Sequence, residues 1–174
     1  MRYIIVDLEA TCWKWKTTPD QMEIIEIGAV ALDSSLQNDG EFSQFVRPIW
    51  WPKISEFCTE LTSIQQSDLN GADDFSMVFP RFLGWIGKQS YTICSWGDYD
   101  MKQLKVDCKR HNIKFPKRFR NHINLKQEFA TFKGIKPCGM AATLQILGLP
   151  LQGKHHRGID DARNIARIAQ CILL

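Results

Sequence analysis

Long hydrophobic runs are missing from this sequence of 174 residues, and their absence excludes one class of protein. No apolar segment approaches the roughly 18 to 20 residues that a membrane-spanning helix needs. The amino terminus also lacks the pattern of a secretory signal peptide, because the apolar residues Ile4, Ile5 and Val6 are followed at once by the acidic Asp7. We therefore expect a cytoplasmic protein without a membrane partner.

Paired cysteines, repeats and flexible linkers are missing too. None of the 6 cysteines belongs to a CxxC pair or a tight Cys/His cluster, which argues against a structural zinc site. Without an export signal, we expect these cysteines to be reduced and to pack as small apolar residues. The chain has no repeat of fixed period and no Gly-, Ser- or Pro-rich segment, so residues 1–174 are predicted to form a single domain.

The charge of the chain is small overall, at +3, but it is unevenly distributed. Residues 1–101 contain 7 Lys/Arg and 15 Asp/Glu, whereas residues 102–136 contain 11 Lys/Arg and 2 Asp/Glu. One interpretation is that a polyanion binds near a cation-binding carboxylate cluster, with contacts from residues such as Lys105, Lys109 and Arg110. The other is that the basic stretch is a solvated helix face and loop.

Hydrophobic periodicity predicts the secondary structure. Strands are expected at residues 3–8, 24–32, 41–49 and 91–96, the first three as an antiparallel meander with its turn between residues 33 and 40. Helices are expected at residues 62–69, 75–86, 100–111, 125–132, 139–147 and 160–173. Pro80 should bend the second helix or mark a late start. The β-β-β-α-β-α order predicts an α/β fold, a mixed central sheet flanked by helices, which resembles the ribonuclease H-like arrangement.

Asp7 and Glu9 are the first chemical signal. On a strand, residues two apart point to the same face, so both carboxylates should lie side by side while Val6 and Leu8 face the other way. Neighbouring carboxylates raise each other's pKa unless a cation joins them, and hard divalent ions suit such a site. The alternative is that the strand ends at Val6 and both side chains are solvated.

Three further aspartates and a histidine have two interpretations each. Asp98 or Asp100, after the strand at 91–96, is either a metal ligand or a helix cap, and Asp100 with Gln103 fits a capping box. His156 and Asp161 precede the last helix; Asp161 is either a ligand or an acidic residue at the positive end of the helix. In the functional interpretation, Gly158 allows the turn that places His156 over a metal site, where it takes a proton from water.

Together these residues resemble the DEDDh family of 3′→5′ exonucleases, and the similarity runs from Ile4 to Ile168, nearly the whole chain. Within that family the sequence is most similar to the Eri-type exoribonucleases. The segments that carry this similarity are residues 7–13 (DLEATCW), 23–29 (EIIEIGA), 57–64 (FCTELTSI) and 156–164 (HRGIDDARN).

The resemblance implies a two-metal mechanism that releases 5′-mononucleotides. It assigns two Mg²⁺ ions, for which Mn²⁺ can substitute, to the carboxylates of Asp7, Glu9, Asp100 and Asp161. Asp100 matches the family better than Asp98 because Met101 and Lys102 follow it. His156 is implied as the general base, and His155 is expected to point elsewhere. Glu26 matches an acidic residue of the family that lies near the site, and the resemblance does not define its role.

The implied partner is single-stranded nucleic acid, with RNA 3′ ends favoured over DNA. Substrate binding is assigned to Leu8, Ala10, Phe57, Leu61, Thr62, Trp96, Met101 and His156. The alternative to substrate binding is ordinary helix packing for Phe57 and Leu61. For Trp96 it is a place in the hydrophobic core. The aromatic and basic residues 13–16 either contact the strand or form an exposed loop.

Two other functions are alternatives to exonuclease activity. A binding module of the same fold would not need to keep all four carboxylates and His156. A ribonuclease H-type endonuclease would not need the His-x4-Asp element and would cut internal bonds.

Overall fold

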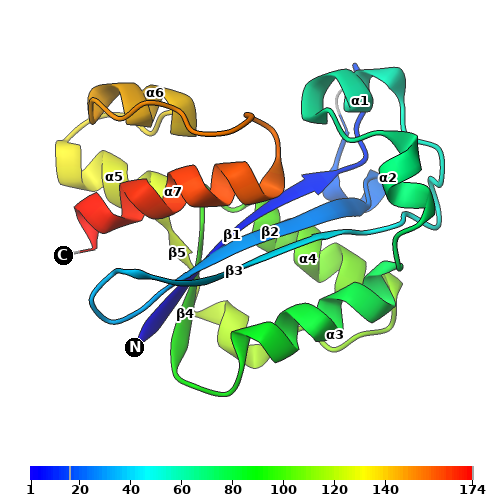
Figure 1. Ribbon diagram of the computed structural model, residues 1–174, viewed down its shortest axis with the longest axis horizontal. Helices are drawn as coiled ribbons and strands as arrows, with labels where there is room; N and C mark the ends of the chain where they lie inside the picture. The colour runs from blue at the N-terminus through cyan, green and yellow to red at the C-terminus, as the bar shows by residue number, and fades with distance from the viewer. Residues whose placement is uncertain (16, 174) are drawn as a thin grey trace.

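Strand β1 (Arg2–Ala10) runs through the middle of a five-stranded mixed sheet (Figure 1). The computed structural model describes residues 1–15 and 17–173. Lys16, one of the residues predicted to contact the nucleic-acid strand, lies outside the described residues. The sheet has the order β3-β2-β1-β4-β5. β1 pairs antiparallel with β2 and parallel with β4. The other strands are β2 (Ile24–Leu32), β3 (Asn38–Phe45), β4 (Tyr91–Ser95) and β5 (Ile123–Asn124). The predicted meander and mixed sheet are confirmed.

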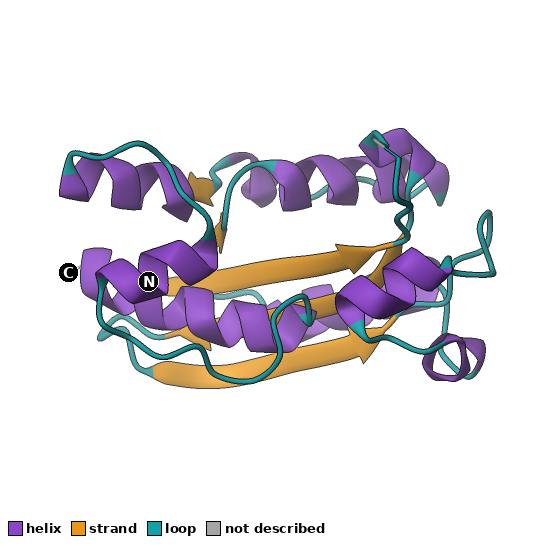
Figure 2. Ribbon diagram, turned by 90° about the horizontal axis from the view of Figure 1, so that it is seen from above, coloured by secondary structure: helices purple, strands orange, loops and turns teal. Residues whose placement is uncertain are grey.

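Helices cover both faces of this sheet (Figure 2). On one face, α3 and α4 pack over a core that contains Ile4, Val6 and Leu8 of β1. On the other face, α5, α6 and α7 pack over a core that contains Ile5. No helix of the described residues is long and apolar enough to span a membrane. The helices are α1 (Glu56–Thr62), α2 (Gln66–Asn70), α3 (Phe75–Ile86), α4 (Tyr99–Arg110), α5 (Leu125–Lys133), α6 (Met140–Ile146), α7 (Gly158–Ile172) and the 3₁₀ turns η1 (Pro19–Gln21) and η2 (Lys117–Arg120).

The prediction of one helix at 62–69 is wrong, because α1 ends at Thr62 and α2 begins at Gln66. Between them Ser63 has a left-handed backbone with φ 62°, and the Thr62 hydroxyl donates to the Cys58 carbonyl and accepts from the Ile64 N–H. These side-chain bonds to the backbone end the first helix, which periodicity alone does not reveal.

Other boundaries differ for reasons that also lie in the backbone. β3 ends at Phe45 instead of residue 49, because the Arg47 N–H donates to the Asp73 carbonyl and Pro48 has no N–H to continue the ladder. Its turn is completed by residue 37, since Asp33 accepts from the Ser35 and Gln37 N–H groups. α3 has no late start and contains Pro80 within it. The two-residue strand β5 was not predicted.

Two glycines bring α7 against the sheet. A Cβ atom built on Gly28 of β2 would lie 2.0 Å from the Gly158 carbonyl carbon, so only glycine fits there. A Cβ on Gly158 would lie 3.1 Å from the Asp7 carbonyl oxygen. The first turn of α7 therefore rests directly on β1 and β2. Gly158 serves close packing and does not make the predicted turn, which has the left-handed residue His156 with φ 63° instead.

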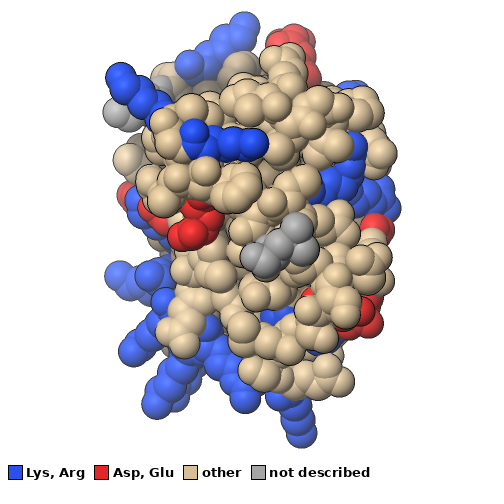
Figure 3. Space-filling model, turned by 90° about the vertical axis from the view of Figure 1, so that its left-hand side faces the viewer, with Lys and Arg blue, Asp and Glu red and all other residues tan. Residues whose placement is uncertain are grey.

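The basic stretch at 102–136 does not form one surface. Arg110 turns inward: its guanidinium donates to Asp107 Oδ1 at 3.0 Å, to the Met22 carbonyl and to the Asp20 carbonyl. Lys102, Lys105 and Lys109 of the same helix are exposed. Figure 3 shows many Lys and Arg side chains extending from the lower part of the face turned to the viewer. Whether the basic stretch binds a polyanion stays a prediction.

Candidate active site

The alternation of β1 directs Asp7 and Glu9 to the sheet face that α7 covers. Val6 and Leu8 pack into the core on the opposite face, as the spacing predicted. The two carboxylates line a pocket of about 370 Å³ at the carboxyl end of the strand. Glu9 is 8% exposed, so at least one of these charges is held away from bulk water.

Asp161, in the first turn of α7, completes a three-carboxylate cluster. Carboxylate oxygens of Asp7, Glu9 and Asp161 lie within 4.8 Å of one another. Asp161 is 5% exposed and accepts hydrogen bonds from the His156 N–H at 2.9 Å and His155 Nδ1 at 2.9 Å. Asp161 does lie in the first turn of α7, as the helix-end interpretation predicted, and it also lines the pocket.

Glu26 braces this helix from β2, a role the sequence did not define. Its buried carboxylate accepts from the Gly158 N–H at 3.0 Å and from Arg157 Nε at 3.1 Å. The bond to Gly158 satisfies one of the free N–H groups at the start of α7. Glu26 thus fixes where α7 begins, and with it the position of Asp161.

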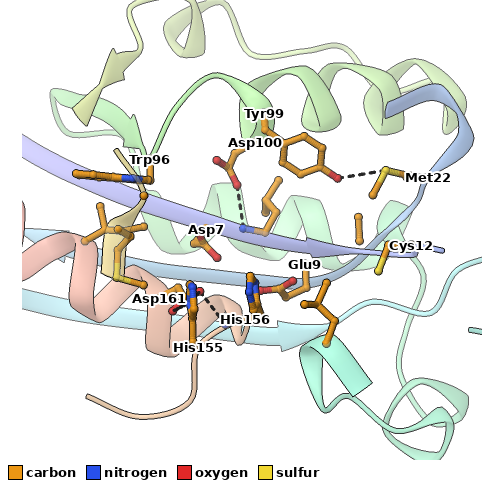
Figure 4. A pocket seen from close by; sticks show the side chains of 16 residues that line it. Asp7, Glu9, Cys12, Met22, Trp96, Tyr99, Asp100, His155, His156 and Asp161 are labelled. Carbon is orange, nitrogen blue, oxygen red and sulfur yellow. Dashed lines mark hydrogen bonds and ion pairs between the residues drawn. The ribbon is translucent and has the colours of Figure 1, made fainter. Parts of the chain in front are cut away.

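Asp100 approaches the same pocket from α4, on the other side of β1 (Figure 4). It is 4% exposed and accepts from the Leu8 N–H at 3.0 Å. The capping-box interpretation is wrong, because α4 begins at Tyr99 and the Gln103 amide donates to Asp107 at 2.7 Å. Asp98 lines a separate hollow and accepts from Asn124, so the structure places Asp100 rather than Asp98 in the pocket.

Both histidines face the carboxylates. The rings of His155 and His156 stack with centroids 4.0 Å apart, and both line the pocket. The expectation that His155 points elsewhere is wrong, because its Nδ1 contacts Asp161. In Figure 4 His156 lies beside Glu9. Burial and the neighbouring His155 lower the pKa of His156, which keeps that ring neutral at physiological pH.

The carboxylates raise one another's pKa. Burial, followed by repulsion from Asp161, raises the pKa of Glu9 to about 9. Burial, then Asp100 and Glu9, raises the pKa of Asp7 well above its usual range. Burial raises the pKa of Asp100 to about 7 despite the hydrogen bond from Leu8. Such shifts mark a cluster that lacks a positive partner.

The donor set fits hard divalent cations. Within the described residues, neither Asp7 nor Glu9 receives a side-chain hydrogen bond or an ion pair, so their oxygens are available as ligands. An all-oxygen carboxylate set is what Mg²⁺ and Mn²⁺ prefer. A divalent ion would also remove the repulsion that raises these pKa values.

The predicted substrate residues divide into two groups. Leu8, Ala10, Leu61, Trp96 and His156 line the pocket together with the carboxylates. Trp96 also donates from Nε1 to the Cys138 carbonyl, so it belongs both to the pocket and to the core packing.

The remaining predicted substrate residues lie elsewhere. Phe57 lines a neighbouring hollow, Thr62 is fully buried with its hydroxyl bonded to Cys58, and Met101 is buried in the core over α3 and α4. Helix periodicity places Phe57 and Leu61 on one face, but they line different hollows. These three residues therefore do not line the pocket that holds the carboxylates, and their contact with substrate stays a prediction.

Several lining residues were missed because nothing in their sequence pattern is distinctive. Tyr99, next to Asp100, extends its hydroxyl toward Met22 Sδ at 3.7 Å. Long-range packing brings these residues to the pocket, and no local motif predicts it. The lining residues not predicted are Cys12, Met22, Tyr99, Gly139, Met140, His155 and Ile165.

The sheet order and the site define a class: a ribonuclease H-like domain with a DEDDh set of acidic residues and a histidine. A family model for the RNase_T exonucleases matches residues 4–169. The chain belongs to this exonuclease family, and to its DEDDh, Eri-type branch.

Relatives and solved structures agree with this membership. The chain is 35% identical to "ERI1 exoribonuclease 2" of Danio rerio and 33% identical to "3'-5' exoribonuclease 1" of Homo sapiens, covering 96% and 95% of this chain. It spans 34% and 50% of those two proteins. The nuclease domain of 3'hExo bound to rAMP superposes with a TM-score of 0.93 at 32% identity, covering 99% of this chain and 91% of that domain.

Proposed function

We propose that the chain is a metal-dependent 3′→5′ exonuclease that acts on single-stranded RNA ends and releases 5′-mononucleotides. The observation that carries the proposal is the convergence of Asp7, Glu9 and Asp161 within 4.8 Å, beside two histidines. The pocket volume of about 370 Å³ is in the range of small-ligand sites and suits a single nucleotide. Relatives named exoribonucleases support RNA over DNA.

The proposed cofactor is Mg²⁺, with Mn²⁺ as a substitute. Asp7, Glu9, Asp100 and Asp161 would hold two such ions, which when bound supply an activated water and stabilise the leaving 3′ oxygen. The chain itself provides their setting: Leu8 orients Asp100, the His156 N–H orients Asp161, and Glu26 fixes α7.

His156 is proposed as the general base. A base must be neutral and have a free nitrogen, and the lowered pKa of His156 meets the first condition. Among the described residues its ring makes no hydrogen bond, whereas His155 Nδ1 is engaged with Asp161. The Nδ1 bond leaves Nε2 of His155 free, so it is the His-x4-Asp spacing of the family that assigns proton removal to His156. We propose a positioning role at Asp161 for His155.

The terminal nucleotide is proposed to lie against the apolar side of the pocket. Leu61 is 37% exposed and Trp96 lines the same pocket, so a base entering here gains apolar contact and stacking. Such contacts do not read sequence, which is what an enzyme that removes one nucleotide after another requires.

Single-stranded oligonucleotides labelled at the 5′ end test the proposal. RNA and DNA of the same sequence are incubated with Mg²⁺, with Mn²⁺ or with a chelator, and products are resolved on a denaturing gel. A ladder that shortens from the 3′ end, faster on RNA and absent with the chelator, is expected. A circular RNA of the same sequence is the matched control.

Each alternative has a distinct outcome in the same assay. Cleavage of the circle would indicate a ribonuclease H-type endonuclease, since a circle has no end. Retention of the labelled RNA on a filter without cleavage under any metal would indicate a binding module.

A further inference from the structure

A group of tryptophans lies beside the site, and no step proposed above uses it. Trp15 is 65% exposed and Trp51 is 47% exposed, which is unusual for side chains of this size unless the surface binds something. Trp13 stacks on Trp15 with centroids 5.9 Å apart and meets Trp51 edge-on at 5.6 Å. The three rings line a hollow of about 230 Å³, here called the tryptophan hollow, formed by Trp13, Trp15, Thr17, Gln21, Trp51 and Lys53.

The tryptophan hollow adjoins the active-site pocket, because two pairs of adjacent residues are divided between their linings. Cys12 and Met22 line the pocket, and their chain neighbours Trp13 and Gln21 line the hollow. Figure 4 shows Cys12 and Met22 together at one end of the pocket, beyond Glu9. A strand whose 3′ end occupies the pocket therefore has the hollow next to it, beyond Cys12 and Met22.

The backbone around the hollow is fixed before any ligand arrives. The buried Glu23 carboxylate accepts from the Ile49, Trp50 and Trp51 N–H groups at 2.8, 2.9 and 2.6 Å. On the other side, the Ser55 hydroxyl donates to the Cys12 carbonyl. Trp51 and Trp13 are thus presented from anchored segments, which lowers the entropy cost of binding.

The chemistry of the lining selects the ligand. Lys53 contributes a positive charge and no carboxylate lines the hollow, so a cationic ligand held in an aromatic cage is disfavoured. Flat rings and an ammonium group suit a nucleobase and its phosphate. A second hollow, which Trp13 and Trp15 also line, contains Glu56 and Glu60 beside Lys14. The tryptophan hollow has Lys53 and no carboxylate in its lining, so a polyanion is directed to the Lys53 side.

We propose that the tryptophan hollow is an upstream binding site for single-stranded RNA, in which bases that precede the 3′-terminal nucleotide stack on Trp15 and Trp51 while Lys53 pairs with a phosphate. This proposal rests on the proposed function, because it places the 3′ end in the pocket.

Direct binding without turnover tests it. The dissociation constants of fluorescein-labelled RNAs of about 12 nucleotides and of 2 nucleotides are measured with a chelator present, for the wild type and for Trp15→Ala, Trp51→Ala and Lys53→Ala. Trp15→Ala and Trp51→Ala should each bind the longer RNA about fivefold or more weakly, the loss of one stack, and Lys53→Ala should weaken the same binding through the lost phosphate contact. All three variants should bind the dinucleotide as the wild type does. Trp15→Phe should retain most of the affinity, and Lys53→Ala should flatten the salt dependence.

Matched controls are Phe132→Ala, whose ring is 59% exposed on α5, and Lys88→Ala at an exposed loop position, both outside the hollow. Melting temperatures show whether each variant is folded. Unchanged affinity for the longer RNA in all three variants, or equal affinity of the wild type for both RNAs, would overturn the proposal. Neither result depends on catalysis: a chain that binds through the tryptophans but never cleaves would overturn the proposed function alone.

Discussion

Buried carboxylates occur in two settings in this molecule, and the contrast identifies the site. Glu23, Glu26 and Asp107 are 1 to 2% exposed, as deeply buried as any acidic residue of the pocket. Each has donors from the chain: Glu23 has three backbone N–H groups, Glu26 has Arg157 and Gly158, and Asp107 has Gln103 and Arg110. Asp7 and Glu9 have none among the described residues.

The difference shows in the pKa values. Burial raises the pKa of Asp107 only to about 6, because Gln103 and Arg110 stabilise its charge, whereas that of Glu9 rises to about 9. Burial alone therefore does not distinguish a functional carboxylate from a structural one. At Asp7 and Glu9 the lack of a donor among the described residues does, since the missing positive charge must come from a ligand. Asp100 and Asp161 have donors, and it is their place in the pocket that assigns them to the site.

The largest effect is expected at the three-carboxylate cluster of Asp7, Glu9 and Asp161. Asp7→Asn and Asp161→Asn should each lower kcat by about 10⁴-fold, the size of a lost metal contribution of several kcal/mol. The folded state should persist, and the metal-free Asp7→Asn protein should melt at a higher temperature because repulsion is relieved. Gel assays and melting curves measure the two effects. A loss of activity accompanied by a lower melting temperature would break the contrast between the two settings.

The two aspartates near α4 provide an internal control. Asp100→Asn should be nearly as damaging as Asp7→Asn, while Asp98→Asn should leave activity close to that of the wild type, because Asp98 lines a different hollow. Equal losses at both positions would contradict the placement of the ligand at Asp100.

The next effect concerns the histidine pair. His156→Ala should lower kcat by about 10²- to 10⁴-fold, the usual contribution of a positioned base, and metal affinity should survive. The pH–rate profile should lose its acidic limb, since no imidazole then has to be neutral. His155→Ala should cost less and should keep that limb. A larger loss at His155, or an unchanged profile for His156→Ala, would reverse the assignment; rates of both variants across pH decide it.

A smaller effect, on stability, is expected at the carboxylates that have donors. Glu23→Ala should lower the free energy of unfolding by about 3 kcal/mol, because three N–H groups lose their acceptor. Urea unfolding measures this change, and Glu56→Ala at an exposed position is the control. An unchanged free energy of unfolding in Glu23→Ala would show that water replaces the carboxylate. The contrast between carboxylates with donors and those without would then be weaker than proposed.

The sequence predicted the fold where periodicity is strong. β2 and α3 begin and end at the predicted residues, because both are long and carry continuous apolar patterns. The break at Ser63 depends on the Thr62 hydroxyl, and β5 is a two-residue strand beside β4, so neither produces a periodic signal. Local side-chain bonds and short pairings are what pattern analysis cannot detect.

The site was predictable in its chemistry and less so in its surroundings. Alternation along β1 was enough to place Asp7 and Glu9 on one face. The contact of Gly28 with Gly158 joins residues 130 positions apart, and only the folded chain reveals it. The spacing of His156 and Asp161 likewise did not show that His155 would reach the same carboxylate.

The smallest effect is the pH dependence of stability without metal. In the native state Glu9 and Asp100, with pKa values of about 9 and about 7, keep protons that the unfolded chain has lost by about pH 5. The native state therefore binds more protons than the unfolded state, and stability must fall as pH rises, up to pH 7 for Asp100 and pH 9 for Glu9.

Other groups change stability outside the interval that matters. Asp107 also lowers stability as pH rises, but only up to about pH 6. The lowered pKa of His156 acts in the opposite direction, but only below its unfolded value of about 6.5. The interval from pH 6.5 to 8 thus lies outside the ranges of His156 and Asp107, and there we expect the pocket carboxylates to lower stability by up to about 1 kcal/mol per pH unit in chelator. Saturating Mg²⁺ should abolish the decline, and Asp7→Asn should make it shallower by removing a neighbouring charge. Urea unfolding at four pH values across this interval, with and without metal, measures it. A flat metal-free profile would mean that these carboxylates find a positive partner within the protein, which would remove the distinction on which the site rests.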